Sequence, residues 1–536
     1  MSCPQGNVTK PSQKCPGTPR TSIDKYGNDA NDLVALGQDQ TLSRKFDIWS
    51  ILAFAFCVLA TWSTFAQNLA VGLTNGGPVN IVWGLVLVGT CNVCVAISLG
   101  ELCSSMPTAL GQAYWVYRLW NTPTGRFFSY LCAWVSTFGW WALTASAIAF
   151  MTNFLLAMKV MFDSTWQGVN QGWLLFIVYF GVTLLFTVFN LVACRKDRVL
   201  PLFNDFTGVG FILLFFAFSL ALLACIGSKA DLDFQSAHFV FATWINETGW
   251  SDGVTWFTGL VQAAYGLTAY DAVIHMVEEI PDPRRNAPKA IYLSVVCSAV
   301  SGLIFMIICL FCIQDIDAVI NTPTGLPFIQ LVQDAVGLKG SAILIGLFIF
   351  NGLGQGISVL TTGSRLTWGF ARDAGLPWST YFGHIDTYWK VPARALWLQC
   401  AIITAIGLLY LFANTVLEAI LSVSTIALTV SYSMPIISLL VVGRDTMTPG
   451  PFHLGKYGLL VNTIAVIYCS ITIVFFFFPG TPNPSTGDMN YAIAIFGIML
   501  VVATAFWFIK GRKTFLQSED GIERIILARR MEADEV

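Results

Sequence analysis

Long apolar runs recur along the chain from residue 47 onward, separated by short polar stretches. A helix needs about 20 apolar residues to cross the hydrocarbon core of a bilayer. The runs are continuous rather than alternating, which excludes a closed β-barrel. The pattern therefore predicts an all-α polytopic membrane protein with twelve transmembrane helices, at 47–73, 79–99, 126–158, 172–193, 204–227, 254–279, 290–313, 341–364, 395–413, 417–442, 457–478 and 490–510.

The two ends of the chain lack this pattern. Residues 1–45 are polar and rich in Ser, Thr, Pro, Asn and Asp, and they contain no apolar segment of the kind that a signal peptide needs. We expect a flexible tail over 1–45, a membrane domain over 46–510 and a second tail over 511–536.

The basic residues predict the orientation, because cytosolic loops carry an excess of Lys and Arg. With the N-terminus in the cytosol, 26 of the 29 Lys and Arg residues fall in cytosolic segments, and only Lys159, Lys229 and Lys339 fall outside. This split supports the helix count and places both termini in the cytosol. The sequon Asn246-Glu247-Thr248 then lies in an outside loop, where Asn246 is a candidate glycosylation site.

Composition narrows the class of protein. Hydrophobic residues make up 55% of the chain and charged residues 11%, whereas about one quarter of a soluble domain is charged. These values exclude a soluble enzyme, a nucleic-acid binder and a disordered protein. The C-x-x-C pairs Cys91/Cys94 and Cys309/Cys312 lie inside apolar runs, so we expect packing residues there. No metal site, cofactor or disulfide framework is expected.

The first predicted helix, 47–73, carries a polar stretch near its middle. Ser, Thr, Gln and Asn crowd residues 60–68, and such residues can satisfy backbone groups that are freed where a helix unwinds. We predict a break with a substrate site here; the alternative is that these side chains join neighbouring helices. The candidate substrate-binding residues are Trp62, Ser63, Gln67 and Asn68.

The sixth predicted helix, 254–279, is unusual in the same way. Tyr265 and Gly266 fall near its midpoint, and helical spacing places Asp271, His275, Glu278 and Glu279 on one face towards the cytosol. An acidic stripe with one histidine suits an ion path or an inner gate. Two alternatives stay open: Glu278 and Glu279 form a solvated helix end, and Asp271 pairs with an arginine such as Arg195 or Arg365.

These two helices are five apart in the chain. Interruptions at corresponding positions indicate a 5+5 inverted repeat, with a site between the broken helices at mid-membrane. We expect repeats over about 47–227 and 254–442, followed by two extra helices over 457–510. Further candidates for the substrate site are Trp140, Tyr270, Asn351 and Tyr432, and Glu101 is expected to join Arg365, Asp271 and Glu278 in an inner gate.

Several blocks resemble the amino acid–polyamine–organocation superfamily. The resemblance covers about residues 40–515, and within it the fungal amino acid/choline transporter branch is the most similar. The superfamily blocks are Ala264-Tyr265-Gly266 through Glu278-Glu279-Ile280-Pro281 to Ile291, Gly100-Glu101-Leu102 to Tyr114, and Ser364-Arg365 to Pro377. The blocks that resemble the branch are 239–250, 313–319 and 450–456.

The resemblance implies twelve helices, a leucine-transporter-type 5+5 fold and uptake of small nitrogenous solutes. Amino-acid members usually carry a glycine-rich break in helix 1 that holds the substrate carboxylate, but residues 62–68 contain no glycine. Trp62 stands there instead, and an aromatic box of Trp62, Trp140, Tyr265 and Tyr270 would suit a quaternary ammonium group. The expected substrate is therefore choline or an ethanolamine-like amine, with a GABA or amino-acid permease as the alternative.

Coupling and mechanism remain hypotheses at this level. Some proton-coupled relatives use a lysine in the fifth helix, which is absent from 204–227, so Asp271, His275 or Glu278 would carry a coupled proton. No ATP-binding motif or convincing catalytic constellation occurs, so we expect a plasma-membrane secondary transporter that acts by alternating access and is not an enzyme. A transporter-like nutrient sensor without flux is the alternative of another class.

Overall fold

The computed structural model describes residues 47–516 apart from 197, 387, 390, 413–415, 486–488 and 490. The predicted tail 1–45 and most of 511–536 therefore lie outside the described residues. Within the described part, eleven helical segments are long and apolar enough to cross a membrane. Their bounds are Ile48–Gln67, Gly77–Ser105, Pro123–Phe162, Gly172–Cys194, Val199–Ser228, Pro283–Cys312, Leu338–Arg372, Ala393–Leu411, Ala419–Val442, Gly455–Phe475 and Ala492–Thr514.

The sixth predicted crossing, 254–279, is the one missing from this set, and it is not a continuous helix. It consists of α12 (Asp252–Gly266), an irregular turn, α13 (Ala272–His275) and a 3-10 turn (Val277–Glu279). The predicted interruption is thus confirmed, and it lies directly after Tyr265 and Gly266.

Several helices extend beyond the predicted apolar runs. α8 (Pro123–Phe162) and α17 (Leu338–Arg372) are each longer than predicted because hydropathy marks only the part that crosses hydrocarbon. Local capping sets the true ends. At the start of α8, for example, the Thr122 hydroxyl accepts a hydrogen bond from the backbone N–H of Gly125 at 3.1 Å, and Pro123 occupies the first turn.

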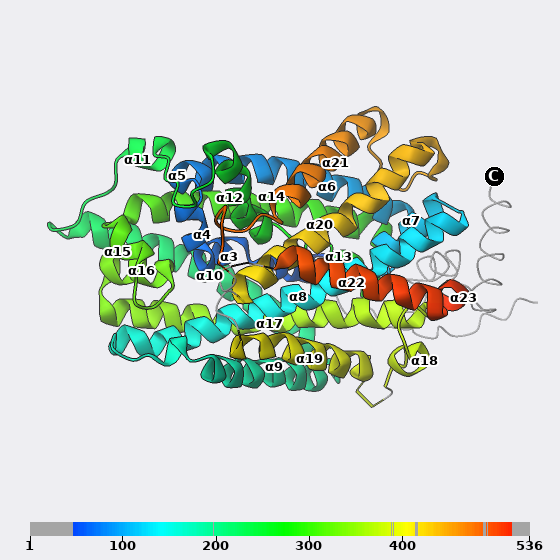
Figure 1. Ribbon diagram of the computed structural model, residues 1–536, viewed down its shortest axis with the longest axis horizontal. Coiled ribbons are helices and arrows are strands. Elements are labelled where there is room, and N and C mark those ends of the chain that lie inside the picture. Colours follow the sequence, from blue (N-terminus) through cyan, green and yellow to red (C-terminus); the bar gives the residue numbers. More distant parts are fainter. Residues whose placement is uncertain are drawn as a thin grey trace, which may run out of the picture.

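The loops alternate between the two ends of the molecule as the basic-residue pattern predicts. α11 (Ala237–Ala242), α15 (Ile316–Ile320) and α16 (Pro327–Val336) gather at one end, whereas α7 (Gln112–Leu119), α18 (Ser379–Phe382) and α23 (Arg512–Thr514) lie at the other (Figure 1). The second group marks the predicted cytosolic end.

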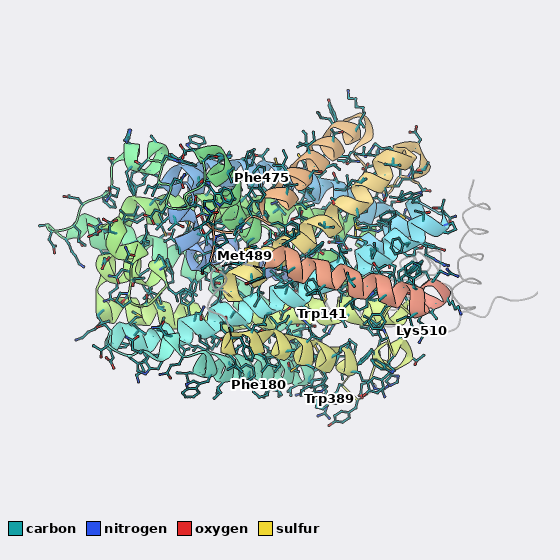
Figure 2. The ribbon with its side chains drawn as sticks, in the orientation of Figure 1. Trp141, Phe180, Trp389, Phe475, Met489 and Lys510 are labelled. Atoms are coloured by element: carbon teal, nitrogen blue, oxygen red, sulfur yellow. The ribbon has the colours of Figure 1, made fainter. Side chains whose placement is uncertain are left out.

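The outer surface of the bundle is apolar. Leu185, Val188 and Phe206 are exposed on α9 (Gly172–Cys194) and α10 (Val199–Ser228), and Phe180 of α9 points away from the bundle (Figure 2). Such a continuous apolar surface is expected where a protein faces lipid.

The first crossing is broken as well. α2 (Ile48–Leu59) ends at Ala60, which adopts the left-handed conformation at φ 47°, and the chain continues as α3 (Thr61–Gln67) and α4 (Leu69–Thr74). The Ala60 carbonyl accepts hydrogen bonds from the hydroxyls of Ser63 at 2.8 Å and Thr64 at 2.9 Å. The Ala60 carbonyl also accepts the Thr64 backbone N–H at 2.9 Å, and the Thr64 hydroxyl lies 3.4 Å from the Leu59 carbonyl at the end of α2. The hydroxyls of this polar stretch thus bond to backbone carbonyls at the break, as expected.

The two broken crossings face each other in the centre of the fold. The Thr61 hydroxyl of α3 donates to the Gly266 carbonyl at the end of α12 at 2.7 Å. Gly266 is required here because a Cβ atom would overlap the ring of Phe65. Two breaks five crossings apart are what a 5+5 repeat requires, while the division into 47–227, 254–442 and 457–510 stays a prediction.

Candidate functional site

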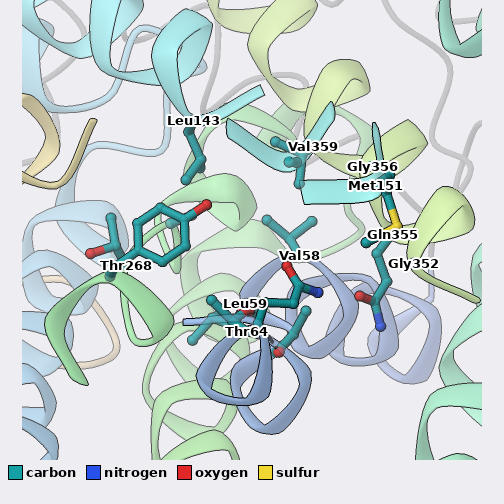
Figure 3. A pocket seen from close by; sticks show the side chains of 15 residues that line it. Val58, Leu59, Thr64, Leu143, Met151, Thr268, Gly352, Gln355, Gly356 and Val359 are labelled. Atoms are coloured by element: carbon teal, nitrogen blue, oxygen red, sulfur yellow. Dashed lines mark hydrogen bonds between the residues drawn. The ribbon is translucent and has the colours of Figure 1, made fainter. Parts of the chain in front are cut away.

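A small cavity lies where the two breaks meet. Its volume is about 50 Å³, and its walls come from the α2–α3 break, α8, the end of α12 and α17 (Figure 3). The lining residues are Val58, Leu59, Ala60, Thr64, Gln67, Leu143, Ala147, Met151, Tyr265, Thr268, Ala269, Gly352, Gln355, Gly356 and Val359.

Polar groups in this lining are neutral. Thr64, Gln67, Thr268 and Gln355 supply hydroxyl and amide groups, and the Tyr265 hydroxyl lies 2.7 Å from the Ser146 hydroxyl. None of the described residues that line the cavity carries a charged side chain. A bound cation or anion would therefore be recognised by backbone dipoles, aromatic faces and neutral hydrogen-bonding groups.

The backbone around the cavity is polarised. α2 and α12 both end at the breaks, so the carboxyl-terminal ends of two helices, of 12 and 15 residues, converge on the cavity. A helix carboxyl terminus carries a partial negative charge, equivalent to about half an elementary charge. The same break also presents the amino-terminal end of α3, with its partial positive charge, because α3 begins at Thr61 directly after Ala60. The carboxyl-terminal ends of α2 and α12 are therefore suited to a cationic group, and the start of α3 is suited to an anionic one.

A hydrogen-bonded chain fixes the wall formed by α17. The Gln355 amide donates to the Asn351 side-chain oxygen at 2.9 Å, and the Asn351 amide donates to the Thr207 carbonyl at 3.0 Å. Asn351 therefore supports the cavity wall from behind and does not itself line the cavity.

Two of the predicted substrate-site residues line this cavity, namely Gln67 and Tyr265. Gly266 allows the end of α12 to approach α3 closely. The Ser63 hydroxyl donates a hydrogen bond to the Ala60 carbonyl. Asn68 instead lines a second, wider cavity of about 380 Å³, together with Thr74 and Glu247. The second cavity lies towards the predicted outer end.

The predicted aromatic box does not form. Trp62 packs into an aromatic cluster with Phe211 and Phe305, at ring-centroid distances of 5.0 and 4.8 Å, and is 1% exposed. In this structure α3 is rotated so that Trp62 points to α10 and α14 (Pro283–Cys312) and does not line the cavity; contact of its face with the substrate stays a prediction. Trp140 and Tyr270 also lie outside the cavity lining, so Tyr265 is the aromatic residue that reaches it.

Asp271 is fully buried at the start of α13 and accepts hydrogen bonds from three different helices. Its Oδ1 atom accepts from the Tyr432 hydroxyl at 2.6 Å. Its Oδ2 atom accepts from Gln112 Nε2 at 2.9 Å and from Trp140 Nε1 at 3.2 Å, and it lies 3.0 Å from His275 Nε2. The alternative that Asp271 pairs with Arg195 or Arg365 is wrong.

The acidic stripe is divided, because the crossing is not one regular helix. Glu278 pairs with Arg372 at 2.9 Å, and Glu279 pairs with Arg365 at 3.1 Å. Both glutamates are buried, so the alternative of a solvated helix end is wrong. The pairs join the end of crossing six to α17.

Glu101 belongs to a different contact. Arg444 Nη2 donates to both of its carboxylate oxygens, at 2.7 and 2.9 Å, and the Leu454 N–H donates to it at 2.7 Å. The predicted group of Glu101, Arg365, Asp271 and Glu278 is therefore spread over separate contacts near the predicted cytosolic end. Their role as a gate stays a prediction.

Asn246 is engaged within its own loop. Its amide nitrogen, the atom that a glycan would modify, donates to the Trp250 carbonyl at 2.8 Å and to Asp252 Oδ1 at 3.0 Å. Glycosylation would replace one of the two amide hydrogens, so at least one of these bonds would be lost; modification at Asn246 stays a prediction.

Sequence reasoning missed much of the lining. Leu143 and Met151 of α8 and Val359 of α17 are ordinary apolar residues, and nothing in the sequence separates them from packing residues. Gly352 and Gly356 could have been predicted as sites of close helix packing, because a G-x-x-x-G spacing indicates that two helices approach closely. A Cβ atom at Gly352 would lie 2.6 Å from the Met151 sulfur.

Comparisons with known proteins show the family of the chain. Residues 46–501 match a family model described as amino acid permease. The chain is similar to the choline transporter of Saccharomyces cerevisiae, with 32% identity over 92% of this chain and 86% of that protein. It is also similar to amino-acid permease 2 of Neurospora crassa, with 30% identity over 92% of this chain and 90% of that one. A third relative, a putative amino acid/polyamine transporter of Macrophomina phaseolina, is 31% identical over 83% of this chain and 97% of its own length.

Proposed function

This chain belongs to the amino acid permease family, and we propose that it is a plasma-membrane permease that imports choline or a related small organic amine. The observation that carries the choice of a cation is the cavity between the breaks. Two helix carboxyl termini converge there, and none of the described residues in its lining is a basic side chain that could hold a carboxylate.

The cavity offers complementary groups for choline. The Tyr265 ring supplies an aromatic surface for the trimethylammonium group, with Leu59, Leu143 and Val359 as apolar neighbours. Thr64, Thr268 and Gln355 supply partners for a hydroxyl. The name of the Saccharomyces cerevisiae relative supports the same class of substrate.

The proposed mechanism is alternating access. The central cavity of about 50 Å³ is much smaller than the roughly 300 Å³ or more of typical ligand sites, so its walls must move apart for loading. Gln67 lines this cavity and the next residue, Asn68, lines the wider outer cavity, whereas the Asp271 network and the two arginine–glutamate pairs lie on the inner side. A form that opens first towards the outside fits this asymmetry.

An amino-acid or GABA permease is the second candidate. The relatives that are named amino-acid permeases favour it, and the Gln67 amide in the cavity could hold a carboxylate. A nutrient sensor without flux would share the fold, and uptake into proteoliposomes separates transport from sensing.

Competition for uptake tests the proposal. Purified protein in liposomes should take up labelled choline, and unlabelled choline should inhibit that uptake more strongly than GABA does. Inhibition by GABA but not by choline would assign the site to amino acids. Empty liposomes and a Tyr265→Leu protein serve as controls.

Import into a cell also requires the proposed orientation. Both termini in the cytosol and proton drive belong to this proposal, and the uneven distribution of Lys and Arg supports the first.

A further inference from the structure

His275 is the one histidine of this chain that is buried. The sequence contains four histidines; His238 is exposed on α11, and His384 and His453 are exposed on loops. The His275 ring lies between two oxygen atoms: Nδ1 is 2.9 Å from the Ala109 carbonyl, and Nε2 is 3.0 Å from Asp271 Oδ2.

The hydrogen bonds reveal where the protons must be. A carbonyl can only accept, so Nδ1 carries a hydrogen. Asp271 already accepts from Gln112 and Trp140, whose nitrogens are donors. The Tyr432 hydroxyl accepts from the Ala269 N–H at 3.2 Å and therefore directs its own hydrogen to Asp271 at 2.6 Å. These three donors require an ionised carboxylate.

An ionised Asp271 leaves only one arrangement for His275. A bare lone pair on Nε2 would face a carboxylate oxygen at 3.0 Å, which is repulsive, so Nε2 also carries a hydrogen. The hydrogen-bond pattern is complete when His275 is an imidazolium and Asp271 a carboxylate. The pair then holds one proton more than the combination of a carboxylate and a neutral ring.

We propose that His275 and Asp271 form the binding site of a co-transported proton, and that the described structure is the proton-loaded form. This inference rests on the proposed transport function and names its coupling site. One proton enters from the outer solution, resides on the imidazole as its second N–H, and leaves to the cytosol.

The other titratable groups around the pair are already occupied. On the same crossing, Glu278 and Glu279 form ion pairs with Arg372 and Arg365 of α17. The Tyr270 hydroxyl donates to Asn92 at 3.4 Å, and Tyr432 of α20 (Val416–Val442) donates to Asp271. α7 and α8 face the pair with Gln112 and Trp140, which do not titrate in the physiological range.

A short chain of contacts links this proton to the central cavity. Thr268 and Ala269 line the cavity, and the Ala269 N–H donates to Tyr432, which donates to Asp271. Widening the break for a substrate would displace Ala269 and so disturb the carboxylate that holds His275. Substrate and proton thus act on the same irregular segment.

Loss of the proton would loosen the inner side. Neutral His275 must present a lone pair either to the Ala109 carbonyl or to Asp271, and both oxygens are about 3 Å away. The 106–111 loop packs tightly on α13, since a Cβ atom at Gly111 would lie 2.7 Å from Ile274 Cγ2. Repulsion within this close contact favours separation of α13 from the loop and opening towards the cytosol.

Nuclear magnetic resonance of a single-histidine protein tests the protonation state directly. The full chain with His238→Gln, His384→Gln and His453→Gln keeps only His275. With ¹⁵N-labelled histidine in lipid bilayers, both ring nitrogens should carry a proton in the form described here. A ring with only one protonated nitrogen in that form would overturn the proposal.

Transport measurements test the coupling. In liposomes with a pH-sensitive dye inside, an inward proton gradient should drive choline accumulation together with proton entry in about one-to-one ratio. His275→Gln should retain choline exchange and lose both gradient-driven accumulation and proton entry, while His384→Gln should behave like the unmodified protein.

The outcomes separate the two proposals. Absence of choline exchange by the unmodified protein would reject choline transport itself. Choline exchange without gradient-driven accumulation, or coupling that survives in His275→Gln, would reject the proton site alone. If His275→Gln fails to fold, as size-exclusion chromatography would reveal, proton entry in the unmodified protein and the resonance experiment still decide.

Discussion

At the scale of single residues, Tyr265 makes the sharpest prediction for substrate recognition. Its ring reaches the cavity and its hydroxyl bonds to Ser146. A cation–π contact is worth about 1–2 kcal/mol when desolvated, so Tyr265→Leu should raise the KM for choline about tenfold. Tyr265→Phe keeps the ring and should change KM much less. Equal effects of the two substitutions on choline uptake would show that the ring face is not used.

Trp62 should behave as a packing residue. Its indole ring is enclosed by Phe211, Phe305 and Phe348. Trp62→Ala should therefore destabilise the fold by about 3–5 kcal/mol and lower the thermal midpoint in detergent. The fraction of the Trp62→Ala protein that folds should still prefer choline over GABA. Trp49→Ala, at a side chain that is 76% exposed, is the matched control. A selective loss of choline binding without loss of stability would contradict this role.

The residue types of the site could be predicted better than their directions. The polar residues at 60–68, and Asp271 within an apolar run, predicted a functional region, because polar groups inside a membrane need partners. Whether Trp62 faces the cavity depends on the rotation of α3, which the packing of α10 and α14 determines. Gln112 as a partner of Asp271 was equally hidden, since it lies about 160 positions away in the sequence.

At the scale of elements, the breaks themselves can be tested. Ala60 adopts φ 47°, a left-handed conformation that costs an alanine about 1–2 kcal/mol and a glycine very little. Ala60→Gly should therefore be neutral or stabilising by about 1 kcal/mol. Ala55→Gly, within the regular part of α2, should destabilise by about 1 kcal/mol. Thermal midpoints of the two proteins should differ in this order, and equal destabilisation would indicate that α2 and α3 are continuous.

The end of α17 makes a prediction about pH. Burial raises the pKa of Asp373 to about 6 from its ordinary value of 3.8, with Glu278 adding to the rise and Arg372 opposing it. The folded state thus binds this proton more tightly than the unfolded chain, so stability should increase as the pH falls from about 7 to 5. Asp373→Asn should raise the thermal midpoint at pH 7.5 and reduce its pH dependence.

Asp163→Asn, at an exposed loop position, is the control for that series. A thermal midpoint of the unmodified protein that falls on acidification over the same range would contradict the raised pKa of Asp373.

The elements show where sequence reasoning ends. The apolar runs predicted the crossings, and the shared interruption of crossings one and six predicted the position of the central cavity. The prediction of one continuous stripe on a helix face, formed by Asp271, His275, Glu278 and Glu279, was wrong. The crossing is irregular at Leu267–Asp271, so regular helical spacing does not apply there. Those four residues consequently have partners on different helices.

At the scale of the whole molecule, the structure is asymmetric between its ends. A cavity of about 380 Å³ lies towards the predicted outer end, while buried ion pairs and the Asp271 network close the predicted cytosolic end. Removing one partner of a buried pair leaves an uncompensated charge and costs about 3–5 kcal/mol. The closed inner side is therefore held by few, strong contacts, which suits a gate that opens once per cycle.

The central claim is that the cavity between the two breaks holds an organic cation. Cryo-electron microscopy of the full chain in lipid nanodiscs with saturating choline tests it most directly. The account predicts density for choline between the α2–α3 break, Tyr265 and Gln355, in a cavity larger than the present 50 Å³. A map in which the choline density lies elsewhere, with this cavity still closed, would contradict it.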